Sequence, residues 1–196
     1  MKHFNLSNVV IIDGPRGSGK SSTSNMVVEE LVKMGYPAEY YKKGLRSHTS
    51  EFANMLTHIF EWAEKDEIVV CDRFLATEWV MSTYHQREDG KKLLDECLII
   101  DKMLLEGNAR NIILLTENEV LEERMAKRGE DGRTWDMDKG AVQPLWKLTE
   151  TLFSSVVILD NGKEKDQGLL AKSIALESIM VTHYPETYNR KGNKSW

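Results

Sequence analysis

The stretch DGPRGSGKSS, Asp13 to Ser22, lies between the apolar run NVVII and a segment with helical periodicity. Gly14, Gly19, Lys20 and Ser21 match the pattern G-x-x-x-x-G-K-[ST]. Glycines let the backbone wrap so that its N–H groups point at phosphate oxygens, and the start of the following helix adds partial positive charge. The stretch therefore predicts a nucleotide phosphate site between a buried strand and a helix.

The polar residues of this loop have separate expected roles. Lys20 is expected to contact the β- and γ-phosphates, and Ser21 to ligate Mg²⁺. Arg16 either stabilises charge on the transferring phosphoryl group or is a solvated loop residue. Asp13 either serves Mg²⁺-bound water or a hydroxyl acceptor, or it hydrogen-bonds the loop backbone. With ATP and Mg²⁺ as the expected cofactors, the predicted nucleotide-binding residues are Gly14, Gly17, Ser18, Gly19, Lys20, Ser21 and Ser22.

Apolar runs alternate with amphipathic stretches along the chain. Strands are expected at 8–12, 38–41, 68–71, 111–115 and 156–159. Helices are expected at 21–34, 51–65, 77–84, 91–106, 119–128, 139–153 and 165–183. Phe60 is expected to point inward from its helix, and Pro144 either kinks the helix at 139–153 or marks its start. This alternation predicts an α/β fold, a doubly wound five-stranded parallel sheet with helices on both faces. We expect one domain over 1–183, with a lid at about 124–138 and a C-terminal tail at 184–196.

Ligands of such sheets bind beyond the carboxyl ends of the strands, which draws attention to Asp72, Arg73 and Phe74 after the third expected strand. Asp72 is a candidate for the Mg²⁺ shell or for catalysis, and Arg73 is a candidate for bidentate binding of an acceptor phosphate. Phe74 is a candidate for contact with the acceptor. The alternative is a structural Asp–Arg pair.

A third cluster is basic. Arg124 and Arg128 are four residues apart and share a helix face, and Arg133 follows a glycine-containing break. Basic residues on a lid close over a triphosphate and exclude water. The alternative is a helix kept in solution by Glu–Lys and Glu–Arg pairs.

Composition narrows the class of protein. The chain of 196 residues is 41% hydrophobic and 29% charged, with a net charge of −5, which argues against a broad nucleic-acid-coating surface. The two cysteines, Cys71 and Cys97, have no metal-ligand spacing and are expected in the core. Neither a leader nor a long apolar segment is evident, so a cytoplasmic protein without a membrane partner is expected.

The three clusters together resemble the thymidylate kinase family of P-loop kinases, from Val9 to about Ile179. The resemblance implies transfer of the γ-phosphate of MgATP to dTMP. It implies that Lys20 and Ser21 hold phosphates and Mg²⁺, that Asp72 and Arg73 serve Mg²⁺ and the acceptor, and that the three arginines of the third cluster belong to the lid. It also places the run DNG after the fifth expected strand, Asp160 to Gly162, near the adenine.

The acceptor side departs from that family. Where the family has an arginine followed by Glu-Pro-Gly-Gly, this chain has YYKKGLRSH, in which Lys43 and Arg46 are candidate phosphate ligands. The helical material before Asp72 is also shorter. Family members are commonly dimers, and the shorter segment leaves a homodimer and a monomer open.

Four functions are consistent with these residues, and three of them differ in the acceptor. The first is a thymidylate-like deoxynucleotide. The second is 5-hydroxymethyluracil in DNA, phosphorylated on the hydroxyl of the base as some phage kinases do, which would use a local basic track and a stacking aromatic. The third is a deoxynucleoside. The fourth is no acceptor at all, in a nucleotide-binding switch.

Overall fold

The computed structural model describes residues 4–42, 51–86, 90–127, 129, 139–161 and 167–184. The strands are β1 (Val9–Asp13), β2 (Ala38–Lys42), β3 (Ile68–Asp72), β4 (Arg110–Leu115) and β5 (Val156–Asp160). The helices are α1 (Lys20–Lys33), α2 (Glu51–Ala63), α3 (Leu75–Tyr84), α4 (Gly90–Glu106), α5 (Asn118–Lys127), α6 (Lys139–Leu152) and α7 (Gln167–His183).

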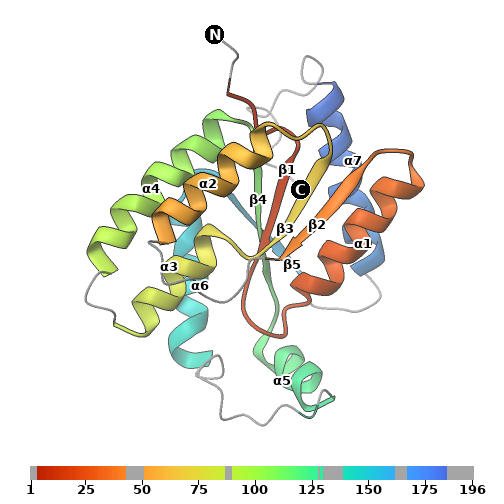
Figure 1. Cartoon of the computed structure of the whole chain (residues 1–196). Helices are drawn as coiled ribbons and strands as arrows, with labels where there is room; N and C mark the ends of the chain where they lie inside the picture. The colour runs from red at the N-terminus through yellow and green to blue at the C-terminus, as the bar shows by residue number, and fades with distance from the viewer. Residues whose placement is uncertain are drawn as a thin grey trace.

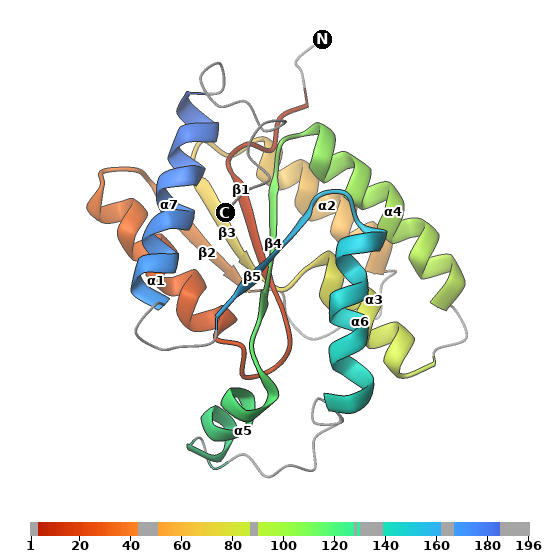
Figure 2. The ribbon, with the colours of Figure 1, turned by 180° about the vertical axis from the view of Figure 1, so that it is seen from behind.

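The strands form one parallel sheet in the order β2-β3-β1-β4-β5. In β1, Ile12 is in register with Asp72 of β3 on one side and with Ile112 of β4 on the other. Helices α2, α3, α4 and α6 cover one face, and α1 and α7 cover the other (Figures 1 and 2). The expected α/β fold with a doubly wound five-stranded parallel sheet is confirmed.

Burial on both faces explains why the central strands are continuous apolar runs. All residues of β1 and β3 are buried. Alternate side chains point to opposite faces, so Val9 and Ile11 enter the core under α2, α3, α4 and α6, whereas Val10 and Ile12 enter the core under α1 and α7. The two cores are thus separated by the sheet itself.

Neighbouring β1 and β3 send the chain to opposite faces. The loop after β1 leads to α1 on one face, and the turn after β3 leads to α3 on the other (Figure 1). A crevice between two such strands is where open α/β sheets bind ligands. The fold therefore brings the Asp13–Ser22 stretch and the Asp72–Phe74 stretch together at one end of the sheet.

The structure corrects one detail of the expected helices and decides between two alternatives at another. Phe60 of α2 was expected to point inward, but its side chain is 53% exposed and meets the ring of Phe4 edge-on. Pro144 lies inside α6 and does not begin it. Both cysteines are buried free thiols, as expected. Among the described helices, none is long and apolar enough to cross a bilayer.

Candidate nucleotide-binding site

The phosphate loop joins the end of β1 to the start of α1. Gly14 has φ 143°, and a Cβ built on it would lie 2.4 Å from the backbone oxygen of Leu114 in β4. Gly19 has φ 88°, and a Cβ there would lie 2.3 Å from the side-chain amide nitrogen of Gln167. Positive φ favours glycine at both positions. At Gly14 the backbone of β4 leaves no room for a side chain, and at Gly19 a side chain would displace the amide of Gln167.

The start of α1 is suited to an anion. Gly19 occupies the N-cap position and supplies no side-chain cap, so the first-turn N–H groups are not capped by that residue. Lys20 begins the helix, is 5% exposed, and donates from Nζ to the backbone oxygen of Pro15 at 2.8 Å. The Oγ of Ser18 is buried and has no hydrogen-bond partner among the described residues. Donors therefore converge inside the loop.

Ser21 and Asp72 meet across the crevice between α1 and β3. The Ser21 hydroxyl donates to Asp72 Oδ2 at 2.5 Å, and the Tyr40 hydroxyl donates to the same oxygen at 2.9 Å. Burial, followed by the hydrogen bond to Asp72, raises the pKa of Tyr40 to about 12. Its hydroxyl is therefore a donor at neutral pH.

These residues fit the Mg²⁺ that a phosphate loop of this kind uses. Asp72 is fully buried, and its Oδ1 has no partner within the described part of the chain. A buried carboxylate oxygen needs a cation or a donor, and hydroxyl and carboxylate oxygens are ligands that Mg²⁺ prefers. Because Ser21 donates its proton to Asp72, its oxygen lone pairs remain for a cation. When bound, Mg²⁺ would neutralise charge on the phosphates.

Asp13 accepts its hydrogen bonds from the start of α3. Its carboxylate is fully buried and accepts hydrogen bonds from the backbone N–H groups of Phe74 and Ala76 and from the Thr77 hydroxyl. All three donors belong to the start of α3, whose own N-cap residue, Phe74, cannot cap it. One expected alternative was that Asp13 hydrogen-bonds the backbone of the phosphate loop. In the structure it hydrogen-bonds backbone N–H groups, but those of α3.

Arg73 stands in a backbone conformation that is uncommon for a non-glycine residue. Its φ is 77°, and its N–H donates to the backbone oxygen of Ile12 at 3.1 Å. The side-chain Nε is buried and has no hydrogen-bond partner in the described residues. A strained backbone and an unsatisfied guanidinium nitrogen beside Asp72 mark this corner as a candidate for ligand binding.

Helix α5 lies against the phosphate loop. A Cβ on Gly17 would lie 3.3 Å from the side chain of Met125. Arg124 donates from Nη1 to the backbone oxygen of Gly17 at 3.5 Å and from Nη2 to that of Asn161 at 3.1 Å. Arg124 is thus placed at the site, and it is held by backbone oxygens.

The other predicted site residues divide into three groups. Arg16 is partly exposed in the loop and Ser22 is exposed. Phe74 is fully buried, 5.0 Å from Trp62 between ring centroids, so the expectation of acceptor contact is corrected: its side chain belongs to the core. The residues that lie outside the described residues are Lys43, Arg46, Arg128 and Arg133.

Two residues of the site were not singled out for it from the sequence, and a third has a contact that was not expected. Tyr40 reaches Asp72 from β2, and Thr77 binds Asp13 from α3. Asn161, which the family resemblance placed near an adenine, donates from Nδ2 to the backbone oxygen of Ser18 at 2.7 Å. Only Asn161 carried a usable signal, since it directly follows a strand at the ligand-binding end of the sheet.

Comparison with known proteins supports the fold. The YorR protein of Bacillus subtilis, solved in complex with phosphorylated GDP, is 20% identical with a TM-score of 0.65, and the match covers 90% of this chain and 98% of that one. At this identity the likeness concerns the fold alone. No curated protein sequence matches the chain. The family model of novel STAND NTPase 3 matches residues 1–141, which include the phosphate loop, Asp72 and α5. This chain, with its P-loop NTPase fold, therefore belongs to the novel STAND NTPase 3 family.

Proposed function

We propose that this protein is an ATP-dependent phosphotransferase that moves the γ-phosphate of MgATP to the phosphate of a thymidylate-like deoxynucleotide. The observation that carries the proposal is the backbone conformation of Arg73 and the burial of its Nε, at the turn between β3 and α3. We call this turn the Arg73 corner. Arg73 is held at positive φ next to the Ser21–Asp72 pair, and its buried Nε has no partner among the described side chains. A nucleotide hydrolase needs no second phosphate ligand at this place, whereas a kinase does.

Each residue of the site has a role in this reaction. Backbone N–H groups of the loop and Lys20 bind the donor phosphates, and Ser21 and Asp72 hold the cation. The planar guanidinium of Arg73 is suited to two oxygens of an acceptor phosphate. An acceptor phosphate oxygen then bonds to the γ-phosphorus as the bond from that phosphorus to the β,γ-bridging oxygen breaks, and ADP leaves with that oxygen. Positioning and charge neutralisation supply the rate.

A nucleotide-hydrolysing switch is the second candidate, because the family in which the chain falls is one of NTPases. In that case ATP would be hydrolysed slowly without any acceptor and the product would stay bound. Arg73 would then either contact the bound ATP or only stabilise the fold.

One experiment separates these functions. Transfer from γ-labelled ATP with Mg²⁺ is measured in parallel with dTMP, the other deoxynucleoside monophosphates, thymidine, plain DNA and DNA containing 5-hydroxymethyluracil, while free phosphate is counted in each reaction. The proposal expects label on dTMP. Label on modified DNA or on thymidine would show that this compound, and not dTMP, is the acceptor. Release of free phosphate alone, at a rate that no acceptor changes, would favour the switch.

The Arg73→Ala variant tests the residue that carries the proposal. Loss of a bidentate phosphate contact should raise KM for the acceptor by about tenfold to a hundredfold while leaving KM for ATP near its original value. Arg73→Gly is the matched variant, since glycine also removes the side chain but relieves the positive φ. Equal rises in both KM values would contradict an acceptor role.

A further inference from the structure

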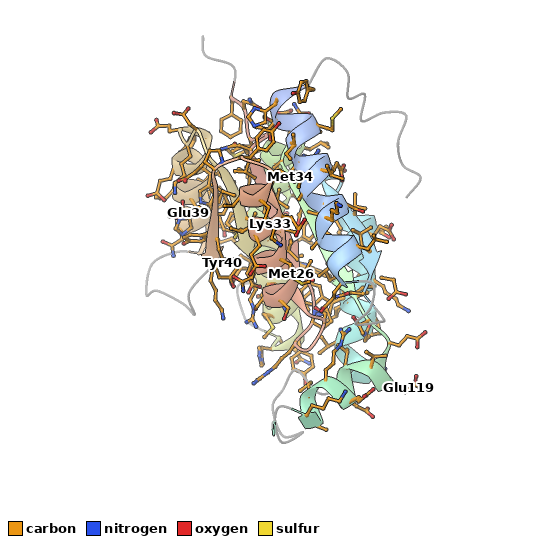
Figure 3. All side chains as sticks on the ribbon, turned by 90° about the vertical axis from the view of Figure 1, so that its right-hand side faces the viewer. Met26, Lys33, Met34, Glu39, Tyr40 and Glu119 are labelled. Atoms are coloured by element: carbon orange, nitrogen blue, oxygen red, sulfur yellow. The ribbon has the colours of Figure 1, made fainter. Side chains whose placement is uncertain are left out.

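The edge strand β2 contributes a side chain, that of Tyr40, to the ligand-binding end of its neighbour β3. Tyr40 and Tyr41 alternate, so their rings lie on opposite faces of the sheet. The Tyr41 hydroxyl lies 2.9 Å from His58 Nε2 of α2, whereas the Tyr40 hydroxyl lies 2.9 Å from Asp72 Oδ2. Figure 3 shows Tyr40 on β2 beside α1. Tyr40 therefore belongs with the phosphate-loop side of the sheet.

The hydrogen bonds of Asp72 are unevenly shared between its two oxygens. Oδ2 accepts from both Ser21 and Tyr40, while Oδ1 is buried without a partner in the described residues. A carboxylate with one hydroxyl donor can rotate about its terminal bond, because that torsion is soft. Two donors from different elements, α1 and β2, fix the plane of the group and direct Oδ1 to one place.

We infer that Tyr40 is a positioning residue for magnesium-dependent nucleotide binding, acting by holding the Asp72 carboxylate in the orientation that serves the cation. This inference rests on the proposed assignment of Ser21 and Asp72 to Mg²⁺, and it adds β2 to the metal site. This role requires no contact between Tyr40 and the substrate. Its effect passes through Asp72, so its loss should weaken the part of nucleotide affinity that depends on Mg²⁺ and leave the remainder unchanged.

The test compares Tyr40→Phe with Tyr41→Phe. Both remove one hydroxyl from adjacent residues of the same strand, but only the first removes a contact with Asp72. ADP affinity is measured by calorimetry with saturating Mg²⁺ and again with EDTA, and the ratio of the two gives the gain due to Mg²⁺. For Tyr40→Phe the gain should fall about threefold to tenfold, the size expected for the net contribution of one hydrogen bond. Tyr41→Phe should keep the wild-type gain.

A purely structural role for Tyr40 would give a different pattern. Thermal melting of both variants without ligand shows how much each hydroxyl stabilises the fold. If Tyr40→Phe melts lower but keeps the wild-type gain from Mg²⁺, the inference is overturned. If the wild-type protein itself shows no gain, the metal assignment fails and the inference fails with it.

The outcome is separable from that of the proposed function, because ADP binding requires no acceptor and no phosphate transfer. If the protein transfers phosphate to no acceptor, but Tyr40→Phe alone lowers the gain in ADP affinity due to Mg²⁺, the kinase proposal fails and the role of Tyr40 is supported. If the protein phosphorylates dTMP, but wild type and Tyr40→Phe gain equally in ADP affinity from Mg²⁺, the kinase proposal is supported and the role of Tyr40 fails.

Discussion

The side-chain amide of Asn161 donates a hydrogen bond of 2.7 Å to the backbone oxygen of Ser18, 143 residues earlier in the chain. Asn161 is 2% exposed, and its own backbone oxygen accepts from Arg124 and from Thr116. The residue after β5 thus joins the phosphate loop to the segments that follow β4. The loop is braced from outside by residues that need not touch the nucleotide.

Asn161→Ala is expected to loosen this bracing. It removes the donor to Ser18 and leaves a buried carbonyl oxygen without that partner, at a cost of about 1–3 kcal/mol in the free energy of unfolding. ADP affinity should fall as well, because the N–H groups of the loop are less well ordered. Urea denaturation and calorimetry measure the two effects. Asn161→Asp is the control, since it keeps the size but not the donor, and an unchanged ADP affinity in both variants would contradict the bracing role.

Gly19→Ala is expected to damage the site more than the same change at Gly35. Both glycines have nearly the same positive φ, 88° and 86°, but a Cβ on Gly35 meets nothing within 4 Å. Gly35→Ala should therefore cost about 1 kcal/mol for the backbone alone and keep ADP affinity. Gly19→Ala adds contact with Gln167 and Asn161 and should lower both stability and ADP affinity further. Equal losses in the two variants would show that crowding at Gly19 is unimportant.

Lys20→Ala should abolish phosphate transfer or hydrolysis, because Lys20 is the buried cation of the loop, whereas Arg16, the other cation there, is partly exposed. A loss of at least about a hundredfold in rate is expected. Lys33→Ala is the matched control at the other end of α1, where the lysine is exposed and pairs with Glu30. It should retain the full rate. Full activity in Lys20→Ala would refute the assignment of the loop.

Asp72→Asn should reduce the rate far more than it reduces ATP affinity. The amide keeps the shape and one oxygen but removes the charge that a cation requires, so the loss falls on the step in which phosphate charge is redistributed. Steady-state kinetics across a range of Mg²⁺ concentrations measure it. Proportional losses of rate and affinity would make Asp72 a binding residue only.

Asp13 makes the stability of the fold depend on pH. Burial raises its pKa above the ordinary value of 3.8, and the hydrogen bonds from Thr77 and Phe74 only partly oppose this. The folded protein therefore keeps this proton to a higher pH than the unfolded chain does. The contribution of Asp13 to stability is then greatest below pH 3.8 and falls as pH rises through the raised pKa of the folded state.

Asp13→Asn removes this dependence because asparagine does not titrate. The free energy of unfolding of the wild type minus that of Asp13→Asn should decrease over that pH interval and then stay constant, as urea denaturation at a series of pH values would show. Thr77→Val keeps the carboxyl group and should keep a pH-dependent difference from Asp13→Asn. A difference between wild type and Asp13→Asn that is flat across the interval would show that the pKa of Asp13 is not raised.

The strands, the helices and the class of fold could be predicted from the sequence, because each depends on a pattern of neighbouring residues. Apolar runs such as Val9–Asp13 lie between amphipathic stretches, and the phosphate loop is a contiguous pattern. The expected ends of the strands and helices lie within two residues of the observed ones. Even so, periodicity alone misplaced Phe60, because the face of α2 that turns inward depends on how α2 packs against α4.

The contacts within the site could not be predicted in this way. Asp13 and Thr77 are 64 residues apart, and Tyr40 and Asp72 are 32 residues apart. Their meeting depends on strand order and on which face of β2 points to α1, and neither follows from spacing. Phe74 was misjudged for the same reason, since its place after a strand suggested the site, while the turn at Arg73 directs its ring into the core.

The cap of α3 comes from a distant strand, and this affects the order of folding. Most helices can satisfy their first N–H groups from a residue next to them, whereas α3 waits for Asp13, 61 residues before Phe74. Those amides gain their acceptor only after β1 and β3 have paired. We therefore expect the start of α3 to become protected from hydrogen exchange during refolding no earlier than β1, so that the Arg73 corner is among the last parts of the molecule to be assembled.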